Sequence, residues 1–462
     1  MAAPALDIAA SLRAACPELP VLTDAPALDA VGVDALRPSR GRPELAAARV
    51  RPLAVAEPRD VDDVARLVRW ANDARVPLVP HGGGSGLMGG ALVLRPAVAV
   101  DLRRLDRIAV DRDACLVRAG AGAALASIDA ALARERLMLG HDPWTVGVAT
   151  VGGAISTAGL GYLGAAAGPI GSQVRAIEAI LADGRILRTR PSPARSTGLD
   201  LTRLFIGTEG TLGIVTEATL AVLPRPEERI VRAYRLGSFG AGVQAAAAFR
   251  RIGVRYACLE LDGDGTPPES ASLLLVFDGL RGEATIHAER AAAILADTGA
   301  EPLPAAEGER QWAERHAIAE RWAARRRLGA DDWQPEATSG QFDYAHVGIP
   351  LAAVERVRAT VRALVERHGV TLVEEGIWHW PELYSIVVTA AADGAAGIRD
   401  VIDGVCRAAE DAGGTMEYCH GVGWKLAHLM EGEHGSAGLD VLRRVKARLD
   451  PHGILNPGKG GL

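Results

Sequence analysis

The longest stretch without a charged side chain, residues 143–174, limits what this chain can fold into more than any other feature. About 20 apolar residues suffice to cross a bilayer, so its length alone permits a membrane span. Its eight glycines argue against one, because each costs a helix interior roughly 1 kcal/mol relative to alanine. Glycine and small residues instead leave the backbone bare for close contact with a large ligand. We therefore expect a covered ligand-binding segment and no membrane span.

The composition excludes several classes of protein. A length of 462 residues predicts two or three domains, and a net charge of -6 offers no basic surface for nucleic acid. The five cysteines are far apart in the sequence and form no CxxC pair, which favours a reducing compartment over a disulfide framework. The N-terminal residues contain no basic region followed by an apolar one, so we expect no signal peptide and a cytoplasmic protein.

The hydrophobic patterns predict an α+β fold in four segments. Residues 1–45, rich in alanine and proline, form a lead-in segment without chemistry. Residues 46–224 alternate strands with helices, and two prolines and several charges mark their end. Residues 225–415 are expected to form an antiparallel sheet covered by helices. Its expected strands are 230–236, 256–261, 272–277 and 384–389, and its expected helices are 284–298, 352–368 and 395–412. Residues 416–462 form the last segment.

Six glycines lie within residues 80–90, directly after an expected strand at 76–79. Consecutive backbone N–H groups in such a loop form a nest that binds anions, so a phosphate-binding loop is predicted. The loop lacks the Lys-Ser/Thr ending of a nucleoside-triphosphate loop and the spacing of a dinucleotide GxGxxG. The alternative interpretation is a flexible surface loop.

Two shorter signals follow the uncharged stretch. Asp183-Gly184 lies between residues 175–182 and 185–189, which predicts a hairpin with a type I′ turn. Residues 205–217 contain a second glycine turn, which leads into a strand that ends near Leu223.

Five motifs occur in a characteristic order: PHGGGSGLMGG at 80–90, VGGAIST at 151–157, GPIGSQV at 168–174 before LADGRIL, GTEGTLGIVTEA at 207–218, and DPHGILNPGK at 450–459. Together they resemble the vanillyl-alcohol-oxidase and p-cresol-methylhydroxylase type of FAD-binding flavoproteins. The resemblance implies that residues 46–224 form an FAD-binding domain of two α+β subdomains, that residues 225–415 form a cap, and that residues 416–462 return to the FAD domain.

The resemblance also implies how FAD is held. Its pyrophosphate is expected on residues 82–86, its ring under residues 152–157, and its adenine and ribose near residues 207–214. The expected cofactor-binding residues are Pro80, His81, Gly82, Gly83, Gly84, Ser85, Gly86, Pro143, Thr150, Val151, Gly152, Gly153, Ser156, Thr157, Gly159, Tyr162, Glu209, Gly210, Gly213, Ile214, Val215, Asn456 and Lys459. Relatives that tether FAD covalently here use a histidine where this chain has Ser85, so dissociable FAD is predicted. For His81, a hydrogen-bonded loop histidine is weighed against a catalytic role.

Two cap motifs concern the substrate. Residues 322–327 resemble the Trp-x-x-Arg of flavoprotein hydroxy-acid dehydrogenases, which implies Arg325 as a carboxylate anchor; the alternative is a solvated helix face. Residues 376–384 stand where these relatives carry a Gly-His and a second histidine as metal ligands, but only His379 is present. Trp378, Trp380 and Tyr384 are expected either to line a substrate pocket or to belong to the cap core.

The catalytic base implied by the resemblance is His420, within Glu417-Tyr-Cys-His-Gly. Relatives read Glu-His-Gly here, with the glutamate as a metal ligand, and Cys419 replaces that glutamate. No bound metal is therefore expected. The alternative is zinc on Cys419, His420 and His379, although no spacing supports that set. Tyr418 and Tyr384 are second choices for the base.

The sequence thus predicts an FAD-dependent oxidase or dehydrogenase that acts on a small hydroxy acid or alcohol and passes electrons to oxygen, a quinone or a protein. A homodimer is an open expectation. Two alternatives remain: an enzyme resembling alkylglycerone-phosphate synthases, which share features of residues 161–164 and 418–423, or a flavin-binding subunit without turnover.

Overall fold

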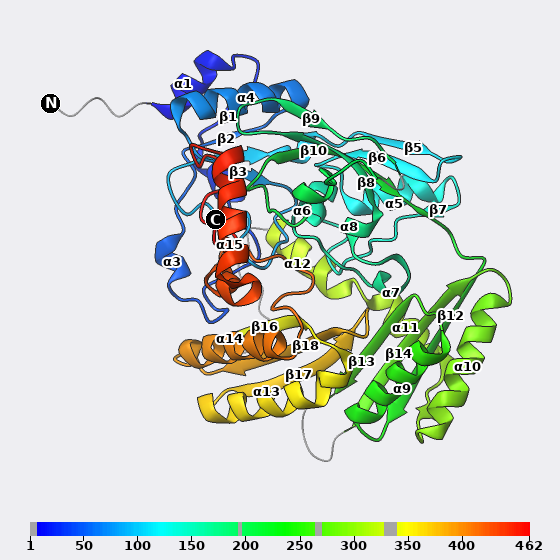
Figure 1. The fold of residues 1–462 in the computed structure, drawn as a ribbon. Helices are drawn as coiled ribbons and strands as arrows, with labels where there is room; N and C mark the ends of the chain where they lie inside the picture. Colours follow the sequence, from blue (N-terminus) through cyan, green and yellow to red (C-terminus); the bar gives the residue numbers. More distant parts are fainter. Residues whose placement is uncertain (1–6, 193–195, 264–269, 328–339) are drawn as a thin grey trace.

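The computed structural model describes residues 7–192, 196–263, 270–327 and 340–462, which build three main sheets with helices packed around them (Figure 1). Two sheets come from the first half of the chain, and the third comes from the segment after Pro224. The predicted α+β class, with a helix-covered antiparallel cap sheet, is confirmed. None of the helices in these ranges is both long and apolar enough to span a bilayer.

The first sheet has the strand order β1-β2-β4-β3, and its three longer strands are parallel. Helices α1 (Ile8–Ala15) and α4 (Val61–Ala74) pack beside it. Helix α4 begins where the Asp60 side chain accepts from the backbone N–H of Asp63, a typical N-cap. The strands are β1 (Val21–Leu22), β2 (Ala54–Ala56), β3 (Leu78–His81) and β4 (Val98–Asp101). Because β3 ends at His81, the glycine loop leaves from the carboxyl end of a parallel strand.

The second sheet is antiparallel, in the order β5-β6-β10-β8-β9. Its strands are β5 (Ile108–Asp111), β6 (Leu116–Gly120), β8 (Val174–Ile180), β9 (Ile186–Arg188) and β10 (Ile214–Ala221). Three short helices lie beside it: α5 (Leu125–Ala133), α6 (Val151–Ser156) and α8 (Ile170–Gln173). Helix α7 (Gly164–Ala167), just before α8, contacts strand β13 of the cap sheet described below. A separate pair joins β7 (Leu137–Met138) to β11 (Leu223–Pro224).

The β8–β9 hairpin exists, but its turn differs from the predicted type I′. That type needs a positive φ at both central residues, whereas Gly184 has φ 76° and Asp183 is not among the residues of positive φ. The backbone N–H of Gly184 donates to the carbonyl of Leu181, and Leu181 donates to the carbonyl of Arg185. The loop is therefore one residue longer than expected, with glycine in the left-handed position.

The cap sheet has seven strands in the order β15-β12-β14-β13-β17-β18-β16, all antiparallel. They are β12 (Glu228–Leu236), β13 (Cys258–Gly263), β14 (Ala271–Gly279), β15 (Glu301–Pro302), β16 (Gln341–Gly348), β17 (Thr371–Trp378) and β18 (Leu383–Ala390). One face packs on α9 (Phe239–Ile252), α10 (Glu283–Asp297), α13 (Val354–His368) and α14 (Ala395–Asp411) in the largest hydrophobic core. Helix α11 (Ala305–Glu314) precedes α12 (Ala317–Arg327). Figure 1 shows α12 between this sheet and the part of the chain that forms the first two sheets, the expected FAD-binding part.

Both terminal segments pack against the FAD-binding part. After the long helix α15 (Met430–Leu449), Leu455 forms a parallel bridge with Leu78 beside the glycine loop. The segment of residues 31–42, within the expected lead-in, is largely buried, and its Ser39 carbonyl accepts from the backbone N–H of Phe342 in β16. Two residues of the expected lead-in segment, Asp34 and Arg40, line the central cavity described below. The remaining short helices are α2 (Ala25–Ala30) and α3 (Leu45–Ala48).

Candidate active site

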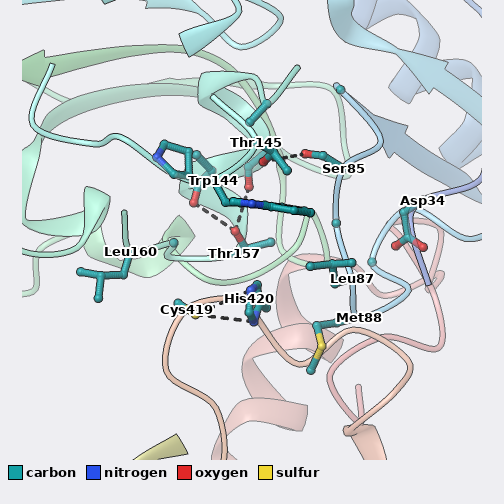
Figure 2. A pocket seen from close by; sticks show the side chains of 18 of the residues that line it. Asp34, Ser85, Leu87, Met88, Trp144, Thr145, Thr157, Leu160, Cys419 and His420 are labelled. Atoms are coloured by element: carbon teal, nitrogen blue, oxygen red, sulfur yellow. Dashed lines mark hydrogen bonds between the residues drawn. The ribbon is translucent and has the colours of Figure 1, made fainter. Parts of the chain in front are cut away.

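A cavity of about 1190 Å³ lies between the FAD-binding part and the cap. Pockets for drug-sized ligands measure roughly 300–1,000 Å³, so this one has room for a large cofactor and a small substrate together. One wall consists of the glycine loop and the uncharged stretch. The other, called the cap wall, consists of cap side chains together with Cys419 and His420 of the last segment. Figure 2 shows the two walls, with Ser85 and Thr145 on one side and Cys419 and His420 on the other.

The glycines of the loop are required by contact between backbone segments. A Cβ atom on Gly83 would overlap the carbonyl oxygen of Val148, and one on Gly82 would overlap the Thr150 hydroxyl. Gly84 has φ 63°, a conformation that side chains disfavour. The loop after β3 therefore packs directly on the start of the uncharged stretch, and the two segments form one continuous wall.

Most residues expected to hold FAD lie on this wall. Those that line the cavity are Pro80, His81, Gly82, Gly83, Gly84, Ser85, Gly86, Pro143, Thr150, Gly152, Gly153, Ser156, Thr157, Gly159, Tyr162, Glu209, Gly210, Ile214 and Val215. Four others, Val151, Gly213, Asn456 and Lys459, do not line it. Val151 belongs to the core under the second sheet. Gly213 has no room for a side chain, because Phe205 and the Ile180 carbonyl lie against it.

Asn456 and Lys459 support the wall from behind. The Asn456 amide donates to the carbonyls of Gly90 (2.9 Å) and Glu209 (2.6 Å), and the Lys459 ammonium donates to the carbonyl of Leu92 (2.8 Å). Burial lowers the pKa of Lys459 to about 8. The NPGK motif thus ties the glycine loop to the turn that carries Glu209.

Two buried carboxyl groups on this wall suit a polar cofactor. Oε1 of Glu209 accepts from the backbone N–H groups of Val422 and Gly423, whereas Oε2 of Glu209 and Oδ2 of Asp34 have no hydrogen-bond partner within the described ranges. Burial raises the pKa of Glu209 to about 7 and that of Asp34 to about 6. Buried polar atoms are normally paired, so these oxygens are available to a bound group. FAD carries hydroxyl and amide groups of the required kind, and the site fits it.

His420 lies on the cavity, and a carboxylate orients its ring. Oε1 of Glu417 accepts from the backbone N–H groups of Tyr418, Cys419 and His420 and lies 3.3 Å from Nδ1 of His420. A histidine whose Nδ1 faces a carboxylate presents Nε2 as its basic atom. The predicted base therefore stands where it faces a ligand.

Aromatic and sulfur groups surround this histidine. His346 of β16 stacks on Tyr344 with ring centroids 4.8 Å apart and meets the His420 ring at 4.7 Å. Sγ of Cys419 lies 3.6 Å from Nδ1 of His346 and 3.5 Å from Nδ1 of His420. Burial lowers the pKa of His346 well below its ordinary value and raises that of the Cys419 thiol. Both shifts favour the neutral forms of His346 and of the Cys419 thiol.

The expected tyrosines do not line the cavity. Tyr384 of β18 pairs with Ile377 across the hairpin, so its side chain points to the covered face, where its hydroxyl donates to Glu375 at 2.7 Å. Tyr418 lies against Gly348 at the end of β16. The predictions of Tyr384 and Tyr418 as catalytic groups are corrected: Tyr384 belongs to the cap core, and Tyr418 packs beside the loop.

Arginines from α11–α12 border the cavity. Arg325, the expected anchor, is exposed and lines it together with Arg321. Trp322 is buried beside Leu87 and Tyr344 and fixes this helix against the glycine loop. Arg315, between the two helices, is held by Asp142 at 3.0 Å. The Trp-x-x-Arg segment therefore reaches the site, and Arg325 remains a predicted anchor.

The expected zinc set is divided in space. His379 lies near Glu260, with Nδ1 3.5 Å from Oε1, and belongs to a group with Cys258, whereas Cys419 and His420 group with His346. Of Trp378 and Trp380, only Trp378 lines the cavity, and its indole N–H donates to Asp262.

Sequence reasoning missed Asp34, Arg40, Tyr344 and His346. Arg40 is only 1% exposed, lies over the rings of Phe342 and Tyr344, and stands 3.6 Å from Asp343. These residues belong to no contiguous motif. The available signal was the alternation Phe342, Tyr344, His346, which places three rings on one face of a strand.

Two family models match the chain: the FAD binding domain over residues 52–190, and the C-terminal domain of FAD linked oxidases over residues 225–460. Glycolate oxidase subunit GlcD of Bacillus subtilis is 27% identical, over 88% of this chain and 88% of that protein. D-2-hydroxyglutarate dehydrogenase of Xanthomonas citri pv. viticola is 28% identical, over 97% of this chain and 96% of that protein. The solved structure of p-cresol methylhydroxylase with substrate bound has the same fold. Its TM-score is 0.75 at 16% identity, over 98% of this chain and 96% of that chain.

Proposed function

The chain belongs to the family of FAD-linked oxidases and is an FAD-dependent oxidoreductase, and on that premise we propose that it oxidises a small 2-hydroxy acid with His420 as the base. The observation that carries this proposal is the His420 ring on the cavity, 3.3 Å from the Glu417 carboxylate. The relatives named as a glycolate oxidase subunit and as a 2-hydroxyglutarate dehydrogenase support the same substrate class.

His420 removes the proton of the substrate hydroxyl through Nε2. Its Nδ1 faces Glu417, so the imidazolium formed by proton uptake lies beside a carboxylate that stabilises it. FAD, held by the residues of the cavity wall, would supply the hydride acceptor for the carbon that bears this hydroxyl. Three backbone N–H groups donate to Oε1 of Glu417 and hold this side chain in place beside the imidazole.

The cavity offers cations for the substrate carboxylate. Arg321 and Arg325 line it from α12, and Arg40 lines it from the N-terminal segment. A guanidinium binds a carboxylate with two parallel hydrogen bonds, and this geometry orients the hydroxyl-bearing carbon. Arg325 is the favoured anchor, since its exposed position lets it reach a ligand in the open part of the cavity.

FAD is held without a covalent bond in this proposal. Ser85 stands where tethering relatives have a histidine, and its hydroxyl instead lies 3.4 Å from that of Thr145. The cofactor-binding residues are those of the cavity wall, with Asn456 and Lys459 acting from behind. Five cysteines outside any disulfide support a cytoplasmic location. The electron acceptor is oxygen, a quinone or a protein, and a homodimer is part of the proposal.

The test is anaerobic addition of 2-hydroxy acids and alcohols to the purified yellow protein. Bleaching by a hydroxy acid is expected, and His420→Asn should slow it by about 10²- to 10⁴-fold while FAD content stays constant. His434→Asn, on the exposed surface of α15, is the matched control and should bleach at the wild-type rate. Acid precipitation should leave a yellow supernatant.

Other outcomes would replace the proposal. Exchange of an acyl for an alkyl chain without bleaching would favour the synthase-like alternative. A flavin that no hydroxy acid or alcohol bleaches, and no exchange activity, would indicate a subunit without turnover. Colour that stays in the acid pellet would contradict dissociable FAD.

A further inference from the structure

Three metal-binding side chains meet on the cap wall of the cavity. His346 comes from β16, whereas Cys419 and His420 come from the loop before α15. Sγ of Cys419 lies 3.6 Å from Nδ1 of His346, and 3.5 Å and 3.7 Å from Nδ1 and Nε2 of His420. One ligand atom from each residue lies within 4.8 Å of the other two.

These distances match those of a tetrahedral zinc site. With Zn–S of about 2.3 Å and Zn–N of about 2.0–2.1 Å, tetrahedral angles place a sulfur and a nitrogen ligand about 3.6 Å apart. Sγ of Cys419 lies 3.6 Å from Nδ1 of His346 and 3.7 Å from Nε2 of His420, and both separations are close to that value. Little side-chain movement is therefore needed for one ion to bind all three groups.

The ligands are already held in orientation by their neighbours. Tyr344 stacks on His346, and Trp378 meets the same ring edge-on at 5.1 Å. Glu417 lies 3.3 Å from Nδ1 of His420 and leaves Nε2, 3.7 Å from the thiol sulfur, as the ligand atom, as carboxylates behind metal-binding histidines do. All three ligands line the cavity, so an ion can enter and its fourth position faces a small ligand or water.

The second group of possible ligands, Cys258, Glu260 and His379, is less suited. Cys258 is fully buried in the core that contains Trp312 and is absent from the cavity lining, so an ion has no path to its sulfur. The cluster around Cys419 also differs from the ligand set that the family resemblance implies, because it contains a thiol in place of a glutamate and takes a histidine from β16.

We propose that His346, Cys419 and His420 bind Zn²⁺ and that the bound ion reversibly inhibits the enzyme. Binding exchanges the thiol proton of Cys419, released to solvent, for a Zn–S bond, while both imidazoles bind as neutral ligands and no electron is transferred. The inhibitory part rests on the proposed function: the ion occupies the lone pair of His420 that takes the substrate proton.

Binding is tested on the FAD-loaded protein without turnover, by calorimetric titration with Zn²⁺ and by the visible spectrum of the Co²⁺ form. We expect one ion per chain and a thiolate–cobalt band. Cys419→Ser and His346→Gln should each weaken Zn²⁺ binding on the order of 100-fold. Removing a metal ligand lowers the affinity for the ion more than removing a residue that hydrogen-bonds to a ligand. Cys115→Ser, at an exposed thiol, and Cys258→Ser should bind as the wild type does.

Inhibition is then measured as the ratio of bleaching rates with and without Zn²⁺ within each variant. The wild-type rate should fall and recover with a chelator, whereas the rate of Cys419→Ser should not respond to Zn²⁺. Unchanged binding in Cys419→Ser, or lost binding in Cys258→Ser, would overturn the site. Turnover that saturating Zn²⁺ leaves unaffected would overturn the inhibition and leave the proposed function standing. Binding as expected in a protein without turnover would support the site and refute the proposed function instead.

Discussion

The two walls of the cavity are built from different kinds of sequence information. The wall from the FAD-binding part is made of backbone, with glycines such as Gly82 and Gly83 where two loops touch. The cap wall is made of side chains, and behind it the buried Asp343 pairs with Lys425 and with Arg40, which itself lines the cavity. A backbone wall needs contiguous small residues and leaves a readable motif, whereas a side-chain wall takes single residues from several strands and leaves none.

Removing the buried charge of the cap wall should have the largest effect. Asp343 is 1% exposed, accepts from the Lys425 ammonium at 2.7 Å and lies 3.6 Å from Arg40. Asp343→Asn takes away the carboxylate between two buried cations, and breaking such a pair costs about 3–5 kcal/mol. Urea unfolding of the FAD-loaded protein measures this loss in the free energy of unfolding.

The matched control is Asp440→Asn, because Asp440 pairs with Arg444 on the exposed surface of α15. Such pairs contribute about 0.5 kcal/mol or less. If the two variants were equally stable, the cap wall would not depend on buried charge and the contrast between the walls would fail.

The backbone wall was predictable because its motifs are local. The loop at residues 80–90 follows a strand directly, and nineteen of the twenty-three residues expected to hold FAD line the cavity. The four exceptions show that membership in a motif does not place a residue on the cavity. Val151 and Gly213 lie within motifs but face the core or a neighbouring side chain, and Asn456 and Lys459 act through the backbone of other residues.

The side-chain wall was not predictable from local patterns. His346 lies near Cys419 because β16 is the edge strand of the cap sheet, next to β18. Arg40 lies beside β16 because the Ser39 carbonyl accepts a hydrogen bond from the backbone N–H of Phe342. Tyr384 lies in the cap core, one of the two environments expected for it. The pairing across the hairpin decides this, because Tyr384 lies opposite Ile377 and shares its covered face.

Glu209 tests whether the backbone wall is kept free of charge. Its folded pKa of about 7 exceeds the ordinary value of 4.5 because the group is buried. Between these values the folded state keeps a proton that the unfolded chain releases, so the free energy of unfolding falls as pH rises from about 4.5 to 7 and then levels off. Glu209→Gln should lack this fall, which amounts to at most about 3 kcal/mol at roughly 1.4 kcal/mol per pKa unit.

Urea unfolding of the FAD-free protein at several pH values between 4.5 and 8 gives this difference. Glu431→Gln, exposed on α15, should run parallel to the wild type at every pH. A constant offset between Glu209→Gln and the wild type would mean that Glu209 is ionised on the wall, and the two walls would then be less different than proposed.

Adding one methyl group to the backbone wall should weaken FAD binding. In Gly83→Ala the new Cβ meets the Val148 carbonyl, a backbone atom that has little freedom to move. Overpacking of this kind costs about 1–3 kcal/mol, so FAD affinity should fall by about 10- to 100-fold. Gly147→Ala, with nothing within 4 Å of its Cβ, should bind FAD normally in the same fluorescence titration. Equal affinities for the two variants would mean that the loop contact does not shape the cofactor site.

Two tyrosines of the cap sheet give the smallest and sharpest contrast. The Tyr384 hydroxyl donates to buried Glu375, so Tyr384→Phe should lower the free energy of unfolding by about 1 kcal/mol and leave the bleaching rate unchanged. Tyr344 lines the cavity, and its buried hydroxyl has no hydrogen-bond partner within the described residues. Tyr344→Phe should therefore keep or slightly raise stability and change the substrate concentration needed for half-maximal bleaching. If instead Tyr384→Phe altered bleaching and Tyr344→Phe altered only stability, the two faces of the cap sheet would be assigned the wrong way round, because only the cavity face can reach a substrate.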